Sequence, residues 1–281
     1  MDLLYWFTPW EESVMVVAAT GAAAIFFSRG CARSKPQLRQ KIYFWTGLAS
    51  IYFVSHTQFD YYSEHQFFIH RLQHLVLHHL GPFLIILSSP LSILLLGMPR
   101  KGRQLCCLAV DWKPLQYLAY VLCNPIVAVT FFSGLIGFWL LPSIHFTAMI
   151  DWRLYRLMNW SMLINGLIFW GLVLNPGPVF STHLSPGTRI AMMLAVVPPQ
   201  IVLGAMIFFA SRELYPIYTI CGRAIGGLSA IGDQQIGGII LWIHGAMMSV
   251  AGILIVVRKE LMPPEITCKT ASGLRGTHSQ Q

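Results

Sequence analysis

Long apolar stretches, separated by short polar or charged links, form the dominant pattern along the chain. A helix needs about 20 consecutive, mostly apolar residues to cross the hydrocarbon core of a membrane. The pattern therefore predicts an all-α, polytopic membrane bundle of seven transmembrane helices. We expect a single domain over residues 1–260 and a disordered cytoplasmic tail over 261–281. The predicted spans cover residues 13–29, 41–58, 70–97, 115–141, 157–174, 188–210 and 235–257.

The composition agrees with a membrane protein. Of the 281 residues, 55% are hydrophobic and only 11% are charged, whereas soluble domains carry about 25% charged residues. The first apolar stretch follows Glu11 and Glu12 instead of a basic segment, and it lacks a small-residue cleavage site. We therefore expect it to remain as a span and not to be removed as a signal peptide.

The basic residues indicate the orientation of the predicted spans. With these boundaries, 14 of the 19 Lys and Arg residues lie on the side of the C-terminal tail and the other five on the opposite side. Cytoplasmic loops are enriched in Lys and Arg, so the N-terminus is expected outside and the C-terminus in the cytoplasm. Topology thus accounts for the net charge of +8. Nucleic-acid binding is not predicted, because no basic face combined with stacking aromatic residues is apparent.

A ladder of histidines marks the outer entrance of the third predicted span. His70, His74 and His78 are spaced four residues apart, which places them on one face of an α-helix. Neutral imidazole is a common metal ligand, and ionisable residues inside a membrane segment are costly and tend to be functional. The ladder therefore predicts metal binding within the bilayer. His79 is expected to point away from His74, because five residues turn an α-helix by about 500°.

Further candidates come from segments that the predicted topology brings to the same side. Imidazole and thioether groups suit copper, and a carboxylate beside the ligands can hold a histidine in one tautomer. The cysteines form no C-x-x-C pair, so neither a structural zinc site nor a redox motif is predicted. The additional candidates for the metal site are His78, His145, Asp233, His244 and Met158.

Several short motifs follow one another in a characteristic order. The first is His65-x4-His70-x2-Gln73-His74, and the last is Asp233-Gln234-Gln235-x-Gly237-Gly238. In this order the motifs resemble those of the CtaG-type, caa-type group of seven-span cytochrome c oxidase assembly factors, over residues 56–257. The resemblance implies His65, His70 and His74 as candidate metal ligands. Members of that group often carry further histidines where this chain has Leu140, Tyr155 and Asn159.

The resemblance implies a non-enzymatic role in maturing a haem–copper oxidase in a bacterial inner membrane. The protein is expected to bind copper as Cu(I) at the outer histidines and to assist its insertion. Its expected partners are a copper-bearing oxidase subunit, a periplasmic copper donor and the lipid bilayer. Two alternatives remain open: a metal-free scaffold that stabilises an oxidase subunit, and a haem-binding electron-transfer protein with histidine ligands. A membrane hydrolase is not predicted, because neither H-E-x-x-H nor G-x-S-x-G occurs in a suitable context.

Overall fold

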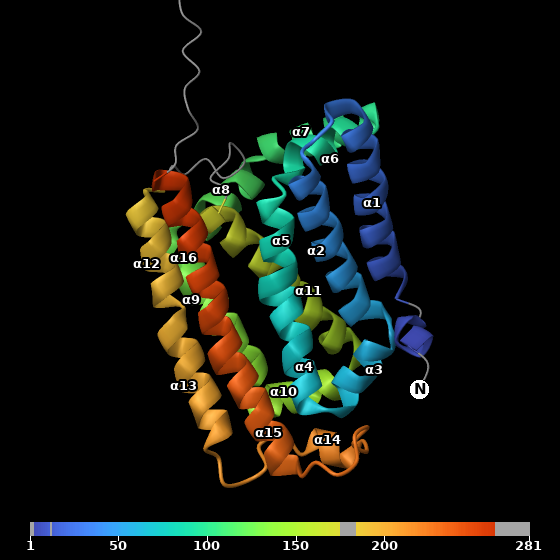
Figure 1. The fold of residues 1–281 in the computed structure, drawn as a ribbon, viewed down its shortest axis with the longest axis vertical. Helices are drawn as coiled ribbons and strands as arrows, with labels where there is room; N and C mark the ends of the chain where they lie inside the picture. Colours follow the sequence, from blue (N-terminus) through green and yellow to red (C-terminus); the bar gives the residue numbers. More distant parts are fainter. Residues whose placement is uncertain (1–2, 12, 175–183, 262–281) are drawn as a thin grey trace, which may run out of the picture.

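The computed structural model describes residues 3–11, 13–174 and 184–261. Within these ranges the chain is helical and contains no β-strand, and its helices lie side by side in an elongated bundle (Figure 1). The all-α prediction is therefore confirmed. The predicted C-terminal tail lies outside the described residues except for Leu261, which ends the last helix.

The first two long helices pack as a pair along one side of the bundle (Figure 1). They are α1 (Val14–Ser34) and α2 (Leu38–His56). The rings of Phe27 and Phe44 stack between them with centroids 3.6 Å apart. Both rings are fully buried, so this pair anchors the contact between the two helices.

The third predicted span is a helix followed by a sharp bend. α4 (Phe67–His74) continues through a π-helical turn (Leu75–Leu80) into α5 (Gly81–Leu87). The chain then turns by 75° into α6 (Pro90–Gly97). Ser89 makes the turn with a φ of 50°, in the left-handed region. Residues 70–97 are therefore not one straight span, because only the part before the bend continues across the bundle.

α6 packs so closely on α1 that only glycine fits at the contact. A Cβ atom on Gly97 would overlap the backbone carbonyl of Phe26, and one on Gly30 would overlap the carbonyl of Ile93. Glycine permits this approach because it has no Cβ. The two glycines thus fix the position to which the chain returns after the bend.

The fourth predicted span is also bent. α8 (Lys113–Leu122) meets α9 (Pro125–Leu140) at an angle of 78°. Asn124 lies at the junction, and its side chain accepts a hydrogen bond from the N–H of Ile126 at 3.0 Å. Neither α8 nor the preceding α7 (Arg100–Asp111) contains a buried residue. Residues 115–141 therefore form one exposed helix and one helix that joins the bundle.

The remaining helices complete the bundle around α11 (Trp152–Leu174), which is largely buried. Its Phe169 ring stacks on Phe132 of α9, with centroids 4.0 Å apart. The other elements are a 3-10 helix (Leu3–Phe7), α3 (Gln58–His65), α10 (Pro142–Ile150), α12 (Pro186–Ala195), α13 (Val197–Phe208), α14 (Ile217–Ile220), α15 (Ala230–Ile239), a second π-helical turn (Ile240–His244) and α16 (Gly245–Leu261).

Four of the described helices are long and apolar enough to cross a membrane, and six spans result if each bent pair counts as one. α2 is not among them, and Arg39 and Lys41 in its first turn lower its mean hydropathy. The chain is therefore compatible with a multi-pass membrane protein. Seven spans and the orientation stay predictions.

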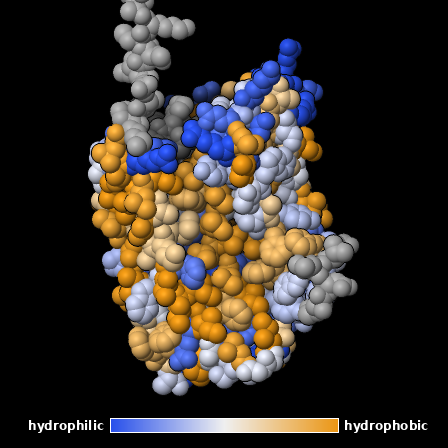
Figure 2. Space-filling model, in the orientation of Figure 1, coloured by the Kyte–Doolittle hydropathy of each residue, from blue (hydrophilic) through white to orange (hydrophobic). Residues whose placement is uncertain are grey.

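The two ends of the bundle differ in what they carry. Figure 2 shows a mainly hydrophobic side surface, with hydrophilic residues gathered at the end where α7 lies. α3, α10 and α14 lie at the opposite end (Figure 1). We call this opposite end the α10 end; the charge pattern predicts that it faces outward.

Candidate metal centre

The neighbouring helix α15 fixes the start of α4, which carries the histidine ladder. The Asp233 carboxylate accepts hydrogen bonds from the backbone N–H groups of Phe67 at 3.1 Å and Phe68 at 2.8 Å. It also forms an ion pair with Arg223 at 3.1 Å. A carboxylate at a helix N-terminus satisfies unpaired N–H groups and interacts favourably with the helix dipole. Asp233, predicted as a candidate for the metal site, therefore positions α4 in the structure.

Three imidazoles meet towards the α10 end of the bundle. The ring centroid of His70 lies 4.4 Å from that of His74 and 5.1 Å from that of His145 in α10. All three side chains are buried. We call His70, His74 and His145 the outer histidine cluster. The structure thus places His145 beside two of the three residues that the family resemblance indicates.

Two members of the outer histidine cluster use both ring nitrogens in hydrogen bonds. His145 Nδ1 donates to the Trp139 carbonyl at 3.1 Å, so its Nε2 accepts from the Tyr218 hydroxyl at 2.9 Å. His74 Nδ1 accepts from the Arg71 guanidinium at 3.2 Å, and its Nε2 donates to Asn159 Oδ1 at 3.2 Å. The contacts of His74 require a neutral imidazole, because one nitrogen accepts and the other donates.

His70 differs from its two neighbours. Its side chain is fully buried, and neither ring nitrogen has a hydrogen-bond partner among the described residues. Leaving a buried polar atom without a partner costs about 1–3 kcal/mol, and native structures seldom do so. A neutral imidazole also keeps one lone pair available for a ligand. His70 is therefore the residue of the cluster best prepared to bind something from outside the chain.

His65, the third predicted ligand, does not join the cluster. Its Nδ1 lies 2.8 Å from the Tyr61 carbonyl, and its ring packs on Tyr61 with centroids 4.3 Å apart. α3 ends at His65, and the chain is extended at Gln66 before α4 begins, so helical spacing does not relate His65 to His70. In the ranges that the structure covers, no group of three or more His, Cys, Asp or Glu residues is arranged to hold a metal ion. The ligand set stays a prediction.

The π-helical turn changes the direction of the deeper histidines. His78 and His79 are both buried, with ring centroids 5.2 Å apart. A π-turn bonds residue i to residue i+5, which brings position 79 under position 74. His79 therefore faces the interior, not away from the ladder as the α-helical spacing predicts. A cavity of about 20 Å³ touches His74, His78 and His79.

The other two candidate ligands are Met158 and His244. Met158 is fully buried in an apolar cluster with Trp139 and Tyr155. His244 ends the second π-helical turn, and its Nδ1 has no partner among the described residues. Neither residue lines the 20 Å³ cavity. Their predicted roles as ligands stay predictions.

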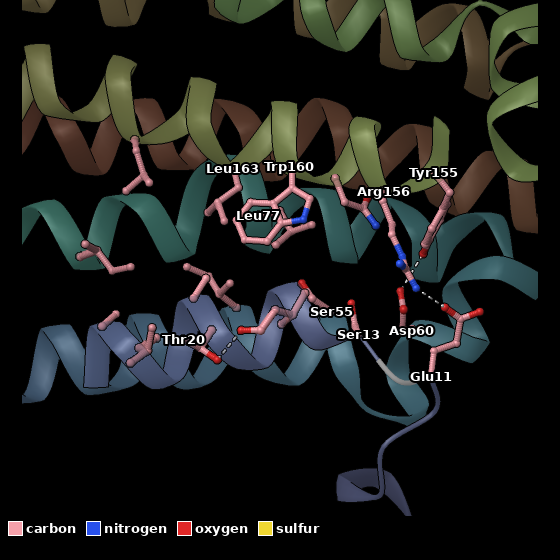
Figure 3. Close-up of a pocket in the computed structure, with 18 residues that line it drawn as sticks. Glu11, Ser13, Thr20, Ser55, Asp60, Leu77, Tyr155, Arg156, Trp160 and Leu163 are labelled. Carbon is pink, nitrogen blue, oxygen red and sulfur yellow. Dashed lines mark hydrogen bonds and ion pairs between the residues drawn. The ribbon is translucent and has the colours of Figure 1, made fainter. Parts of the chain in front are cut away.

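A larger cavity of about 210 Å³ opens between α1, α2, α5 and α11. Figure 3 shows its polar end, where Tyr155 points toward Asp60 and Arg156 points toward Glu11. The remainder of the wall is mostly apolar. Asn159 also lines this cavity and accepts the hydrogen bond from His74. Asn159 thus contacts both the cavity and the outer histidine cluster. We call this cavity of about 210 Å³ the lateral cavity.

A buried carboxyl group lines the lateral cavity and was missed by the sequence analysis. Asp60 accepts hydrogen bonds from the Tyr155 hydroxyl at 2.7 Å and from Gln73 Nε2 at 2.6 Å. The Tyr155 ring centroid is 6.2 Å from that of His70. The only indication of this contact in the sequence is that Gln73 belongs to the histidine motif. Nothing in the spacing relates Asp60 to it, because α3 and α4 are separate helices.

Because the Asp60 carboxyl group is buried, we predict that the stability of the folded protein depends on pH. Burial raises the pKa of Asp60 to about 6, although hydrogen bonds from Tyr155 and Gln73 oppose the shift. An unfolded aspartate titrates near ~3.9, so the stabilisation is fully present below about pH 4 and is lost as the pH rises through about 6. In the wild type, we expect the free energy of unfolding to fall by ~3 kcal/mol between about pH 4 and 7. In Asp60→Asn, this fall should be absent.

Unfolding of the detergent-solubilised protein at several pH values measures this difference. Burial and the charge of Asp60 also raise the pKa of Glu64, so both proteins carry Glu64→Gln, which removes this second titration from the comparison. A variant with the same pH slope as the wild type would show that Asp60 titrates normally.

A family model for the cytochrome c oxidase caa3 assembly factors, of the CtaG type, matches residues 22–261. The chain belongs to this family. The match runs from α1 to the end of α16 and includes the whole outer histidine cluster. The family resemblance inferred from the motifs is therefore confirmed.

Similar curated proteins come from mycobacteria. Uncharacterized proteins of Mycobacterium bovis and Mycobacterium tuberculosis are each 25% identical to this chain over 244 residues, which is 79% of this chain and 35% of theirs. A Mycobacterium leprae protein is 24% identical over 267 residues, or 86% of this chain and 38% of its own length. The chain thus spans little more than a third of these relatives. No solved structure matches it.

Proposed function

We propose that this protein acts in the assembly of a cytochrome c oxidase, binding Cu(I) as its cargo at the outer histidine cluster and assisting insertion of the metal into a copper-bearing oxidase subunit. The observation that carries the proposal is His70, a buried imidazole whose ring nitrogens have no partner among the described residues. Imidazole is a suitable copper ligand, so bound Cu(I) would satisfy one of these nitrogens.

His145 is the best-placed second ligand. Its Nδ1 donates to the Trp139 carbonyl, which fixes the tautomer that leaves a lone pair on Nε2. That lone pair accepts from the Tyr218 hydroxyl, which also lies 3.9 Å from the Met149 sulfur. The hydroxyl thus has a second acceptor within reach when the metal takes its place. Neutral ligands add no charge to the single positive charge of Cu(I), which limits the cost of placing the ion in a low-dielectric interior.

The lateral cavity supports a sideways route for the metal. Asn159 contacts both this cavity and His74, so a rotation of one amide side chain would connect them. In the predicted orientation, a periplasmic donor would deliver Cu(I) at the α10 end. The oxidase subunit would then receive it through the membrane-facing side. This route suits a protein of the bacterial inner membrane that works on another membrane protein.

Copper retention by the purified protein tests this proposal. After Cu(I) loading in detergent, we expect His70→Ala to lose its copper at ~10–100-fold lower concentrations of a Cu(I) chelator than the wild type. Even changes beside a metal ligand weaken binding by this much. His65→Ala is the matched control, because it removes the same side chain outside the cluster. Equal retention by the wild type and His70→Ala would refute the copper site.

A further inference from the structure

Arg71 is a buried arginine without a carboxylate partner in the part of the chain that the structure describes. Its side chain is 3% exposed. The ion pairs among the described residues join other arginines to Glu11, Glu260 and Asp233. Asp233 is itself occupied by Arg223 and by the first N–H groups of α4.

The contacts of the Arg71 guanidinium are uncharged. One Nη donates to His74 Nδ1 at 3.2 Å, and the group lies 5.4 Å from the centroid of the Phe67 ring. Its Nε has no partner among the described residues. Arginine remains protonated in proteins, and a buried charge without compensation is strongly unfavourable. The site therefore lacks a negative charge.

Arg71 also lines a small cavity. The 20 Å³ cavity is lined by Arg71, His74, His78 and His79, and the remainder of its wall is apolar. A space of this size holds about one water-sized particle. It is too small for phosphate or for the carboxylate of a partner side chain. The N–H groups of His74 and His78 already donate to Asn159 and Asn165. His79 Nδ1 has no partner among the described residues and can carry an N–H group that donates.

We propose that a small monovalent anion of halide size binds in this cavity against Arg71. The anion supplies the missing negative charge, and the guanidinium N–H groups are its principal donors. It also reduces the repulsion that a Cu(I) ion in the outer histidine cluster would experience from Arg71. The anion site stands on Arg71 and the cavity alone, and it does not require that copper binds.

Thermal unfolding of the copper-free, detergent-purified full chain provides the test. Sodium chloride is titrated against sodium gluconate at constant ionic strength, because gluconate is too large for the cavity. We expect a saturable rise of about 5 °C in the unfolding midpoint with chloride, as mass action requires for a ligand of the folded state. Bromide should replace chloride. Equal midpoints in chloride and gluconate would overturn the proposal.

Two variants locate the effect. Arg71→Gln removes the charge and should abolish the response to chloride. Arg156→Gln is the matched control, because Arg156 is half-exposed and pairs with Glu11, and it should keep the response. A chloride response that survives in Arg71→Gln would place the anion elsewhere and refute the site.

Crystals of the wild type grown in bromide give an answer that does not depend on the folding of a variant. We expect one anomalous peak in the cavity beside Arg71, and a water molecule there instead would refute the proposal. Because no experiment in this set contains copper, a negative result leaves the copper site standing. Failed copper retention likewise leaves the anion site standing.

Discussion

Replacing His70 by alanine is expected to abolish most of the oxidase activity that depends on this protein, while the protein itself still accumulates in the membrane. In the wild type, His70 is the only member of the outer histidine cluster whose two ring nitrogens both lack a hydrogen-bond partner among the described residues. Alanine removes this ligand and also removes a buried polar group that costs stability. The folded protein should therefore survive the change. We expect the oxidase activity of isolated membranes to fall by at least ~10-fold.

The measurement compares cells that produce the wild type, His70→Ala or His65→Ala as their only copy. His65→Ala should support near-normal oxidase activity, because His65 contacts Tyr61 and not the cluster. Added copper should partly restore the His70→Ala cells if the lost step is metal delivery. Full activity with His70→Ala at a normal protein level would favour the metal-free scaffold. A haem band in the visible spectrum of the purified protein would favour the electron-transfer alternative.

The sequence predicted the helical bundle and the helix that carries His70 and His74 because both depend on local patterns. Apolar length indicates a membrane helix, and four-residue spacing places side chains on one face. His79 shows where such a pattern fails. A single π-turn adds to the number of residues per turn, so every later side chain changes direction. No residue in Leu75–Leu80 indicates this turn, although Pro82 just beyond it lacks the N–H needed to continue the helix.

The membership of the outer histidine cluster depends on tertiary contacts. His65 belongs to the motif but lies beyond the break at Gln66, whereas His145 comes from a different helix and reaches His70. The sequence contains both histidines, but residue spacing does not show which of them lies closer to His70. In the sequence, Arg71 stands out in no way from the other Lys and Arg residues, which number 19 with it. Its importance arises from the absence of a carboxylate nearby, which only the packed structure reveals for the described residues.

The bend after α5 leads to the prediction with the largest effect on stability. In a straight third span, Gly97 would lie far from α1. In the bent arrangement, a Cβ atom on Gly97 would overlap the backbone carbonyl of Phe26, and a side-chain rotation cannot relieve a clash with backbone. We expect Gly97→Ala to lower the free energy of unfolding by about 3 kcal/mol, the upper part of the range for overpacking. The midpoint of thermal unfolding in detergent should fall by about 10 °C.

Gly21→Ala is the matched control for this experiment. Gly21 lies in the same helix α1, and no atom lies within 4 Å of the position that its Cβ would take. Alanine favours a helix over glycine by up to ~1 kcal/mol, so this variant should be neutral or slightly more stable. If Gly97→Ala and Gly21→Ala unfold at the same temperature, α6 does not rest on α1. The straight span over residues 70–97 would then be correct. A large difference would support the bend and the packing of α1, which forms one wall of the lateral cavity.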